Sequence, residues 1–187
     1  MPYPGQLLLA APSLGDPFEH AVILLVEHDE SGSLGVVLNQ PSTLAVSEVL
    51  PQWRSVVSGE QVVFSGGPVG MDSALALAAV RGEAEPAGFR RVSGGIGVGI
   101  GLIDLDADPD LMAVHVDAMR VFAGYAGWAP AQLQGELDEG SWVVVDPTDP
   151  SVDLFELPVA QQWAILVARQ PGTVGWWVHC PRDPRLN

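Results

Sequence analysis

Two short apolar runs near the N-terminus constrain the fold of this chain more than any other feature. Residues 6–11 read QLLLAA and residues 21–27 read AVILLVE, and the loop between them is rich in proline, glycine and aspartate. Because the second run consists almost wholly of Leu and β-branched residues, it predicts a central strand covered on both faces. A turn over 29–33 leads into a third run, 34–38, which we expect to pair back on the second as a hairpin.

The rest of the chain predicts further strands and short helices with no repeat and no long linker. A run of glycines alternating with apolar residues over 95–102 predicts a strand with one bare face, which a helix or an aromatic ring can approach closely. The apolar run 73–80 predicts another strand, although its alanines leave a helix as the alternative. Because strands and helices do not alternate strictly, the pattern favours an α+β layout over a doubly wound parallel sheet. Other strands are expected over 62–65, 119–124 and 142–145, and helices over 47–50, 130–139 and 159–168.

Length and composition predict one soluble domain, spanning residues 1–187. Apolar residues make up 48% of the chain, which is typical of a packed globular protein. The longest apolar runs are far shorter than the roughly 20 residues that a membrane-spanning helix needs. The chain opens with no basic and apolar leader and has a single cysteine, so we expect a cytoplasmic protein without disulfides and without a membrane partner.

The charge balance argues against nucleic-acid binding. Acidic residues number 23 against eight arginines and no lysine, for a net charge of −15. Binding to a duplex requires several phosphates to be neutralised together, whereas these cations are dispersed. We therefore expect no direct contact with nucleic acid, and the acidity itself favours solubility. The arginines are Arg54, Arg81, Arg90, Arg91, Arg120, Arg169, Arg182 and Arg185.

Three blocks of the sequence resemble the AlgH/YqgE family of small bacterial proteins. They are residues 5–42, the run FSGGPV at 64–69, and RVFAGYAGWAPAQLQGEL at 120–137, in the family's order and spacing. The resemblance implies a mixed, largely antiparallel β-sheet folded into a pseudo-barrel with helices packed outside. It implies little about activity, because members are often labelled transcriptional regulators without an established biochemical function.

The chain departs from the family pattern at four positions. Gln40 stands where the family usually has Arg, and Ala78 falls where it usually has His. Ala131 and Gln134 replace the Gly and Glu of the usual Gly-Gln-Leu-Glu. If the Arg and His serve a shared chemistry, this protein lacks it, which argues against an enzymatic function.

Four polar residues of the first block are candidates for a site. Glu27 and His28 end a buried strand, where a carboxylate and an imidazole could do acid–base work. Alternatively they emerge into solvent or bond loop backbone. Asp16 in the loop could bind a ligand, or it could close an Asx-type turn. Asn39 could contact a ligand, or it could tie two loops together.

The run Gly-Tyr-Ala-Gly-Trp provides the leading candidate pocket. Tyr125, Gly127 and Trp128 are expected between a strand and a helix N-terminus, where free N–H groups suit an anion. The aromatic rings would wall this pocket, or they would plug the end of the barrel. Gly66 and Gly67 follow a strand but precede a proline, which predicts a tight turn or close packing rather than a phosphate loop.

No metal, nucleotide or nucleophile motif is present, so no cofactor is expected, and Cys180 is interpreted as a buried or incidental thiol. The first functional hypothesis is a non-catalytic binding or regulatory protein with a protein or small-molecule partner, itself a monomer or a weak homodimer. The second is an enzyme with an unfamiliar site that joins the four polar residues to the 125–128 corner. A third is transcriptional regulation without direct DNA contact. Catalysis requires the polar groups to converge around one cavity, which distinguishes the first two.

Overall fold

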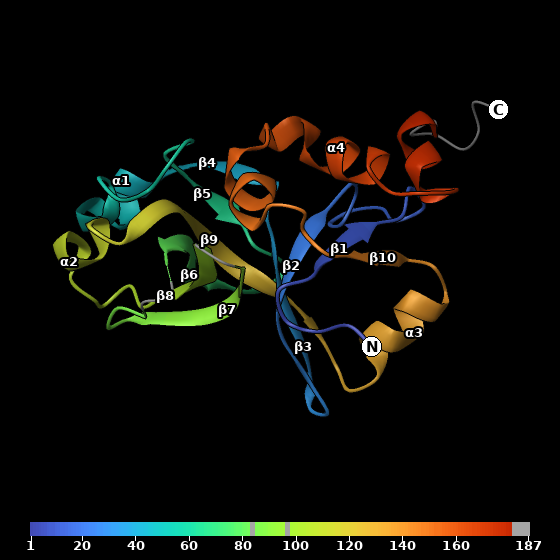
Figure 1. The fold of residues 1–187 in the computed structure, drawn as a ribbon, viewed down its shortest axis with the longest axis horizontal. Coiled ribbons are helices and arrows are strands. Elements are labelled where there is room, and N and C mark those ends of the chain that lie inside the picture. The colour runs from blue at the N-terminus through green and yellow to red at the C-terminus, as the bar shows by residue number, and fades with distance from the viewer. Residues whose placement is uncertain (83–84, 96–97, 181–187) are drawn as a thin grey trace.

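A computed structural model describes residues 1–82, 85–95 and 98–180 and shows a curled β-sheet with helices outside it (Figure 1). The strands are β1 (Leu7–Ala10), β2 (Val22–Asp29), β3 (Gly32–Val37), β4 (Pro41–Ala45), β5 (Val62–Ser65), β6 (Val69–Arg81), β7 (Phe89–Gly95), β8 (Val98–Ile103), β9 (Val116–Trp128) and β10 (Trp142–Val145). The helical segments are α1 (Val46–Val49), η1 (Pro51–Trp53), α2 (Pro109–Ala113), α3 (Gln132–Asp138), η2 (Val152–Glu156), η3 (Val159–Gln161), α4 (Gln162–Ala168) and η4 (Val174–His179).

Strand β9 joins the two halves of the sheet. The strand order is β10-β1-β2-β3-β9-β6-β8-β7, and each neighbouring pair is antiparallel. β9 also pairs in parallel with β5, which in turn pairs with β4. The predicted α+β class, with a mixed and largely antiparallel curled sheet, is confirmed.

Buried side chains form three apolar clusters around the sheet. One lies beneath the C-terminal helices, where Trp163, Leu166 and Val167 of α4 pack on β1 and β2. A second joins β6 and β8 to η1 and α2, and a third joins β1 and β2 to α3. Figure 1 shows this division, with α1 and α2 at one end, α3 at the other and α4 along the top. No helix within the described ranges is both long and apolar enough to traverse a bilayer.

The structure corrects the sequence prediction around the glycine-rich stretch. Residues 95–102 do not form one strand: β7 and β8 form a hairpin, and residues 96–97 lie outside the described residues. The predicted close approach of an aromatic ring is confirmed at Gly101, where a Cβ atom would lie 2.6 Å from the Phe89 ring. The strand predicted over 73–80 is confirmed as part of β6, which pairs with both β8 and β9, and the helical alternative is wrong.

Candidate functional site

Asn39 acts as a backbone clamp at the end of β3. Its side-chain Oδ1 accepts a hydrogen bond from the Val22 N–H at 3.0 Å, and its Nδ2 donates to the His20 carbonyl oxygen at 2.9 Å. Both halves of the amide therefore hold the entrance to β2 against β3. Of the two alternatives predicted for Asn39, the structure shows the one in which the amide ties two segments together.

The Asp16 loop lies beside this clamp, but its carboxylate is exposed and no described residue hydrogen-bonds to it. The predicted Asx-type turn is not seen, because backbone bonds close the loop instead: Leu14 N–H donates to Ala11 and Phe18 N–H donates to Gly15.

Glu27 and His28 diverge at the end of β2. The Glu27 carboxylate accepts a hydrogen bond from the Arg90 Nη2 at 2.8 Å, which links β2 to β7. The His28 Nδ1 lies 2.7 Å from the Ser33 Oγ on β3. Glu27, His28 and Asn39 thus have separate partners. Asp16 has none among the described residues, and the structure does not bring the four candidates around one cavity.

The sequence predicted that the run at 125–128 lies between a strand and a helix N-terminus, and this prediction is wrong. The run completes β9, and α3 begins only at Gln132. Tyr125 and Trp128 are three residues apart on a strand, so they face opposite sides and cannot wall one pocket. The Tyr125 ring lies near Gly70 and Gly127, whereas Trp128 is buried under α3.

Gly66 and Gly67 pack closely against the backbone of β9 and do not form a phosphate-binding loop. A Cβ atom on Gly66 would lie 2.3 Å from the Gly124 carbonyl oxygen, and one on Gly67 would lie 2.2 Å from the Tyr125 carbonyl carbon. The Gly66 N–H donates to Ala123 at 2.8 Å. The predicted alternative of close packing is therefore the one that the structure shows.

Glu136 is a structural residue that the sequence reasoning missed. Its Oε2 accepts hydrogen bonds from the indole Nε1 of Trp128 and of Trp142, both at 2.8 Å. The two indole rings meet edge to face at 6.0 Å. Gln132 donates to the other carboxylate oxygen at 2.9 Å. These hydrogen bonds fix α3 against β9 and β10. The sequence signal that could have indicated them is a glutamate in a short predicted helix with a tryptophan on each side of that helix.

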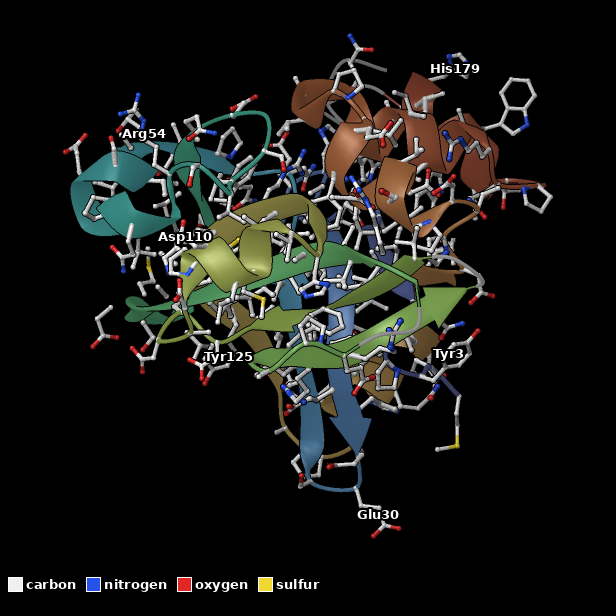
Figure 2. All side chains as sticks on the ribbon, turned by 60° about the vertical axis from the view of Figure 1, so that its left-hand side comes forward. Tyr3, Glu30, Arg54, Asp110, Tyr125 and His179 are labelled. Carbon is white, nitrogen blue, oxygen red and sulfur yellow. The ribbon has the colours of Figure 1, made fainter. Side chains whose placement is uncertain are left out.

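A groove of about 810 Å³ lies between the rigidly held α3 and the tip of the β2–β3 hairpin. Figure 1 shows this hairpin extending past the rest of the sheet, and Figure 2 shows Glu30 at its tip. The residues around the groove are Met1, Pro2, His28, Asp29, Glu30, Gly32, Ser33, Pro130, Ala131, Leu133 and Gln134. His28 is thus the one member of the predicted pocket that lines this groove.

The rim of the groove is acidic. Asp29 accepts hydrogen bonds from the Ser31 hydroxyl and N–H, which hold the pKa of its carboxyl below the usual range. Asp29 therefore stays ionised near neutral pH, next to the exposed Glu30. Gly32 permits the close contact between hairpin and β9, since its φ is +142° and a Cβ atom would lie 2.5 Å from the Trp128 carbonyl oxygen.

Most described arginines are neutralised locally. Ion pairs join Arg81 to Asp117, Arg90 to Glu27, Arg91 to Glu85 and Arg169 to Asp153. Arg120 is buried, and Arg182 and Arg185 lie outside the described residues.

Within the described ranges, no three His, Cys, Asp or Glu side chains are placed to hold a metal ion. Cys180 is exposed, so the alternative of a buried thiol is wrong.

Comparison with known proteins decides the family. A model of the AlgH-like family matches residues 7–175. The chain belongs to the AlgH-like family. It is 48% identical to the UPF0301 protein SCO2948 of Streptomyces coelicolor, covering 98% of this chain and 94% of that protein. It is 46% identical to a UPF0301 protein of Mycobacterium ulcerans, covering 98% and 90%.

Two solved structures share the AlgH-like fold. Protein DIP2367 from Corynebacterium diphtheriae matches with a TM-score of 0.86 at 32% identity, covering 95% of this chain and 92% of that one. The AlgH protein from Pseudomonas aeruginosa matches with a TM-score of 0.66 at 26% identity, covering 95% and 93%. The family resemblance and the fold that it implied are confirmed.

The four departures of this AlgH-like protein fall in three environments. Ala131 and Gln134 line the groove. Gln40 donates from Nε2 to the Pro17 carbonyl oxygen at 2.7 Å and so supports the loop before β2. Ala78 is fully buried in β6. Its methyl group packs in the core and offers no polar group for chemistry.

Proposed function

We propose that this AlgH-like protein is a non-catalytic binding protein that takes up a basic, partly apolar segment of a protein partner. The observation that carries the proposal is the groove between the β2–β3 hairpin and α3. Its size suits an extended stretch of polypeptide, and its walls are fixed by backbone pairing on one side and by the Glu136–indole contacts on the other. Walls that are held in place lower the entropy cost of binding.

The chemistry of the groove supports a cationic and apolar occupant. Met1, Pro130 and Ala131 provide exposed apolar surface. Asp29 and Glu30 provide negative charge at the rim. The net charge of −15 attracts a basic partner over a longer range and raises its association rate. The same charge disfavours a nucleic acid, so a regulatory effect on transcription would pass through a protein partner.

The separation of the polar candidates supports binding over catalysis. An acid–base site needs its groups within hydrogen-bond reach of one substrate. Here Glu27 is paired with Arg90, and Asn39 is occupied by backbone on both sides of its amide. His28 alone faces the groove.

The test is a fluorescence-anisotropy screen of extended peptides that vary in net charge and apolar content. We expect peptides with Lys or Arg next to Leu or Phe to bind best, and their affinity to fall as salt rises. Gln134→Trp fills the groove from the exposed face of α3 and should weaken binding about tenfold or more.

Gln161→Trp is the matched control, because it places the same ring at an exposed position of η3 outside the groove. Equal losses in the two variants, or a preference for acidic peptides, would contradict the proposal.

A further inference from the structure

A second cavity, of about 200 Å³, lies on the opposite side of the sheet from α3. Three chain segments meet there: the loop before β2, the residue after β3, and the C-terminal helices that lie over β1 and β2 (Figure 1). The residues around it are His20, Asn39, Ala160, Trp163, Ala164, Trp177, Val178 and Cys180. Neither the groove nor its proposed partner involves any of these residues.

Fixed aromatic rings form the walls of this cavity. The Trp163 indole Nε1 donates to the Ala10 carbonyl oxygen at 2.9 Å, which anchors the ring on β1. The His20 imidazole lies 4.2 Å from the Trp163 ring, centre to centre, with 37° between their planes. Asn39 holds the His20 carbonyl, and the His20 backbone has a φ of +51°, which a non-glycine residue rarely adopts. The ring of His20 is thus held against Trp163 at a cost in backbone strain.

The described lining carries no Asp, Glu, Lys or Arg side chain, although the chain as a whole is acidic. The Glu19 carboxylate approaches only to 4.0 Å of the His20 Nδ1. Polar contacts can come from the imidazole, from the remaining lone pair of the Asn39 carbonyl oxygen and from the exposed Cys180 thiol. Apart from the half-exposed Glu19 carboxylate, the described residues around the cavity provide no charge that would offset the desolvation of an ion, so the site favours a neutral molecule.

We infer that this cavity binds a small, uncharged, planar heteroaromatic molecule of one or two rings. Two indoles and an imidazole offer faces for stacking, and a few polar groups at the edge can fix the orientation of ring nitrogens or carbonyls. Ala160 and Ala164 are four residues apart on consecutive helical turns, and their short side chains leave the space open.

The test uses adenine, uracil, nicotinamide and indole as probes, each at millimolar concentration, with the full chain. Binding is followed by NMR through the indole N–H signals, assigned by single Trp→Phe variants. We expect at least one probe to shift the Trp163 and Trp177 signals in a saturable way. The signal of Trp53, which is fully buried in another cluster, should not move.

Ala164→Leu should fill the cavity and weaken binding at least tenfold. Ala168→Leu is its control, since it makes the same change on an exposed position of the same helix. His20→Gly removes the stacked ring and also relieves the positive φ, so it should fold normally and still bind less well. Unchanged Trp128 and Trp142 signals would verify folding.

The inference is overturned if no probe shifts the Trp163 signal, or if Ala164→Leu binds as the unmodified chain does. It is independent of the proposed groove function, because Gln134→Trp should leave binding of the probes unchanged.

Discussion

The guanidinium carbon of Arg120 lies 4.9 Å from the centre of the Phe64 ring, so a buried cation rests on an aromatic face. The guanidinium donates hydrogen bonds to the carbonyl oxygens of Leu154 at 2.9 Å and Phe155 at 2.8 Å. Burial lowers the pKa of Arg120, while the charge of Glu60 opposes this shift. Arg120 therefore fastens η2 to the centre of β9 by its fork of donors.

Arg120→Lys should lower the free energy of unfolding by about 1–3 kcal/mol. A single ammonium cannot reach both carbonyls with the geometry of the planar guanidinium, so at least one buried acceptor loses its partner. Urea denaturation followed by circular dichroism measures the change. Arg81→Lys, at a largely exposed ion pair, should change stability by no more than about 0.5 kcal/mol. Equal effects at both positions would show that the fork geometry is unimportant.

Glu136→Ala should destabilise the chain by about 2 kcal/mol, because two indole N–H groups lose their shared acceptor. Glu139→Ala is the control, because Glu139 is an exposed residue directly after the last residue of α3. This change should lower the free energy of unfolding by less than about 0.5 kcal/mol. Thermal melts of both variants make the comparison. If the Glu136→Ala variant has the same melting temperature as the unmodified chain, then α3 is held by apolar packing alone.

Gly67→Ala should unfold the chain or destabilise it by about 3 kcal/mol or more. Its φ is +147°, and the added Cβ would lie 2.2 Å from backbone of β9, which cannot move aside without breaking the strand pairing. Gly15→Ala adds the same methyl group where nothing lies within 4 Å, and it should be tolerated. Soluble yield and amide NMR spectra distinguish the two outcomes.

The contact between Tyr3 and Asp146 should make the N-terminal segment sensitive to acid. The Tyr3 hydroxyl and the Gln6 amide donate to the Asp146 carboxylate, and they hold the pKa of Asp146 below its usual range. A carboxyl whose pKa is lowered by folding stabilises the folded state at pH values above its pKa in the unfolded chain, about 4. This stabilisation is lost as the pH falls through the pKa of the folded state.

Tyr3→Phe should therefore raise the pKa of Asp146 toward its usual value, as measured by the carboxyl carbon shift during an NMR titration. Because the same contact raises the pKa of Tyr3, Asp146→Asn should lower the pKa of the phenol. An Asp146 titration that is identical with and without the Tyr3 hydroxyl would refute this account.

The sequence predicted best where a local pattern decides the structure. The apolar run at 21–27 and the hairpin turn after it predicted β2 and β3, since burial on both faces selects an apolar run regardless of its partners. The helix predicted over 130–139 is observed as α3, where Pro130 before it and Gly140 after it are typical of a helix start and a helix end.

The prediction failed where distant partners decide the structure. Glycines near Tyr125 were interpreted as a turn into a helix, but Gly124 lets β9 lie against Gly67, which is far away in the chain. Glu27 and Arg90 are 63 positions apart, and Trp163 and Ala10 are 153 apart, so no local spacing reports these contacts. The cavity beside His20 likewise joins residues that are far apart in the chain, since His20 and Asn39 meet the C-terminal helices there.

The position of β9 has a consequence for synthesis on the ribosome. Strands β3, β5 and β6 all pair with β9, so each has an unfilled hydrogen-bonding edge until residue 128 has left the exit tunnel. During that interval the two halves of the sheet lack the strand that joins them. A nascent chain of this protein thus keeps strand edges open to pairing with another chain until more than two-thirds of it has been translated.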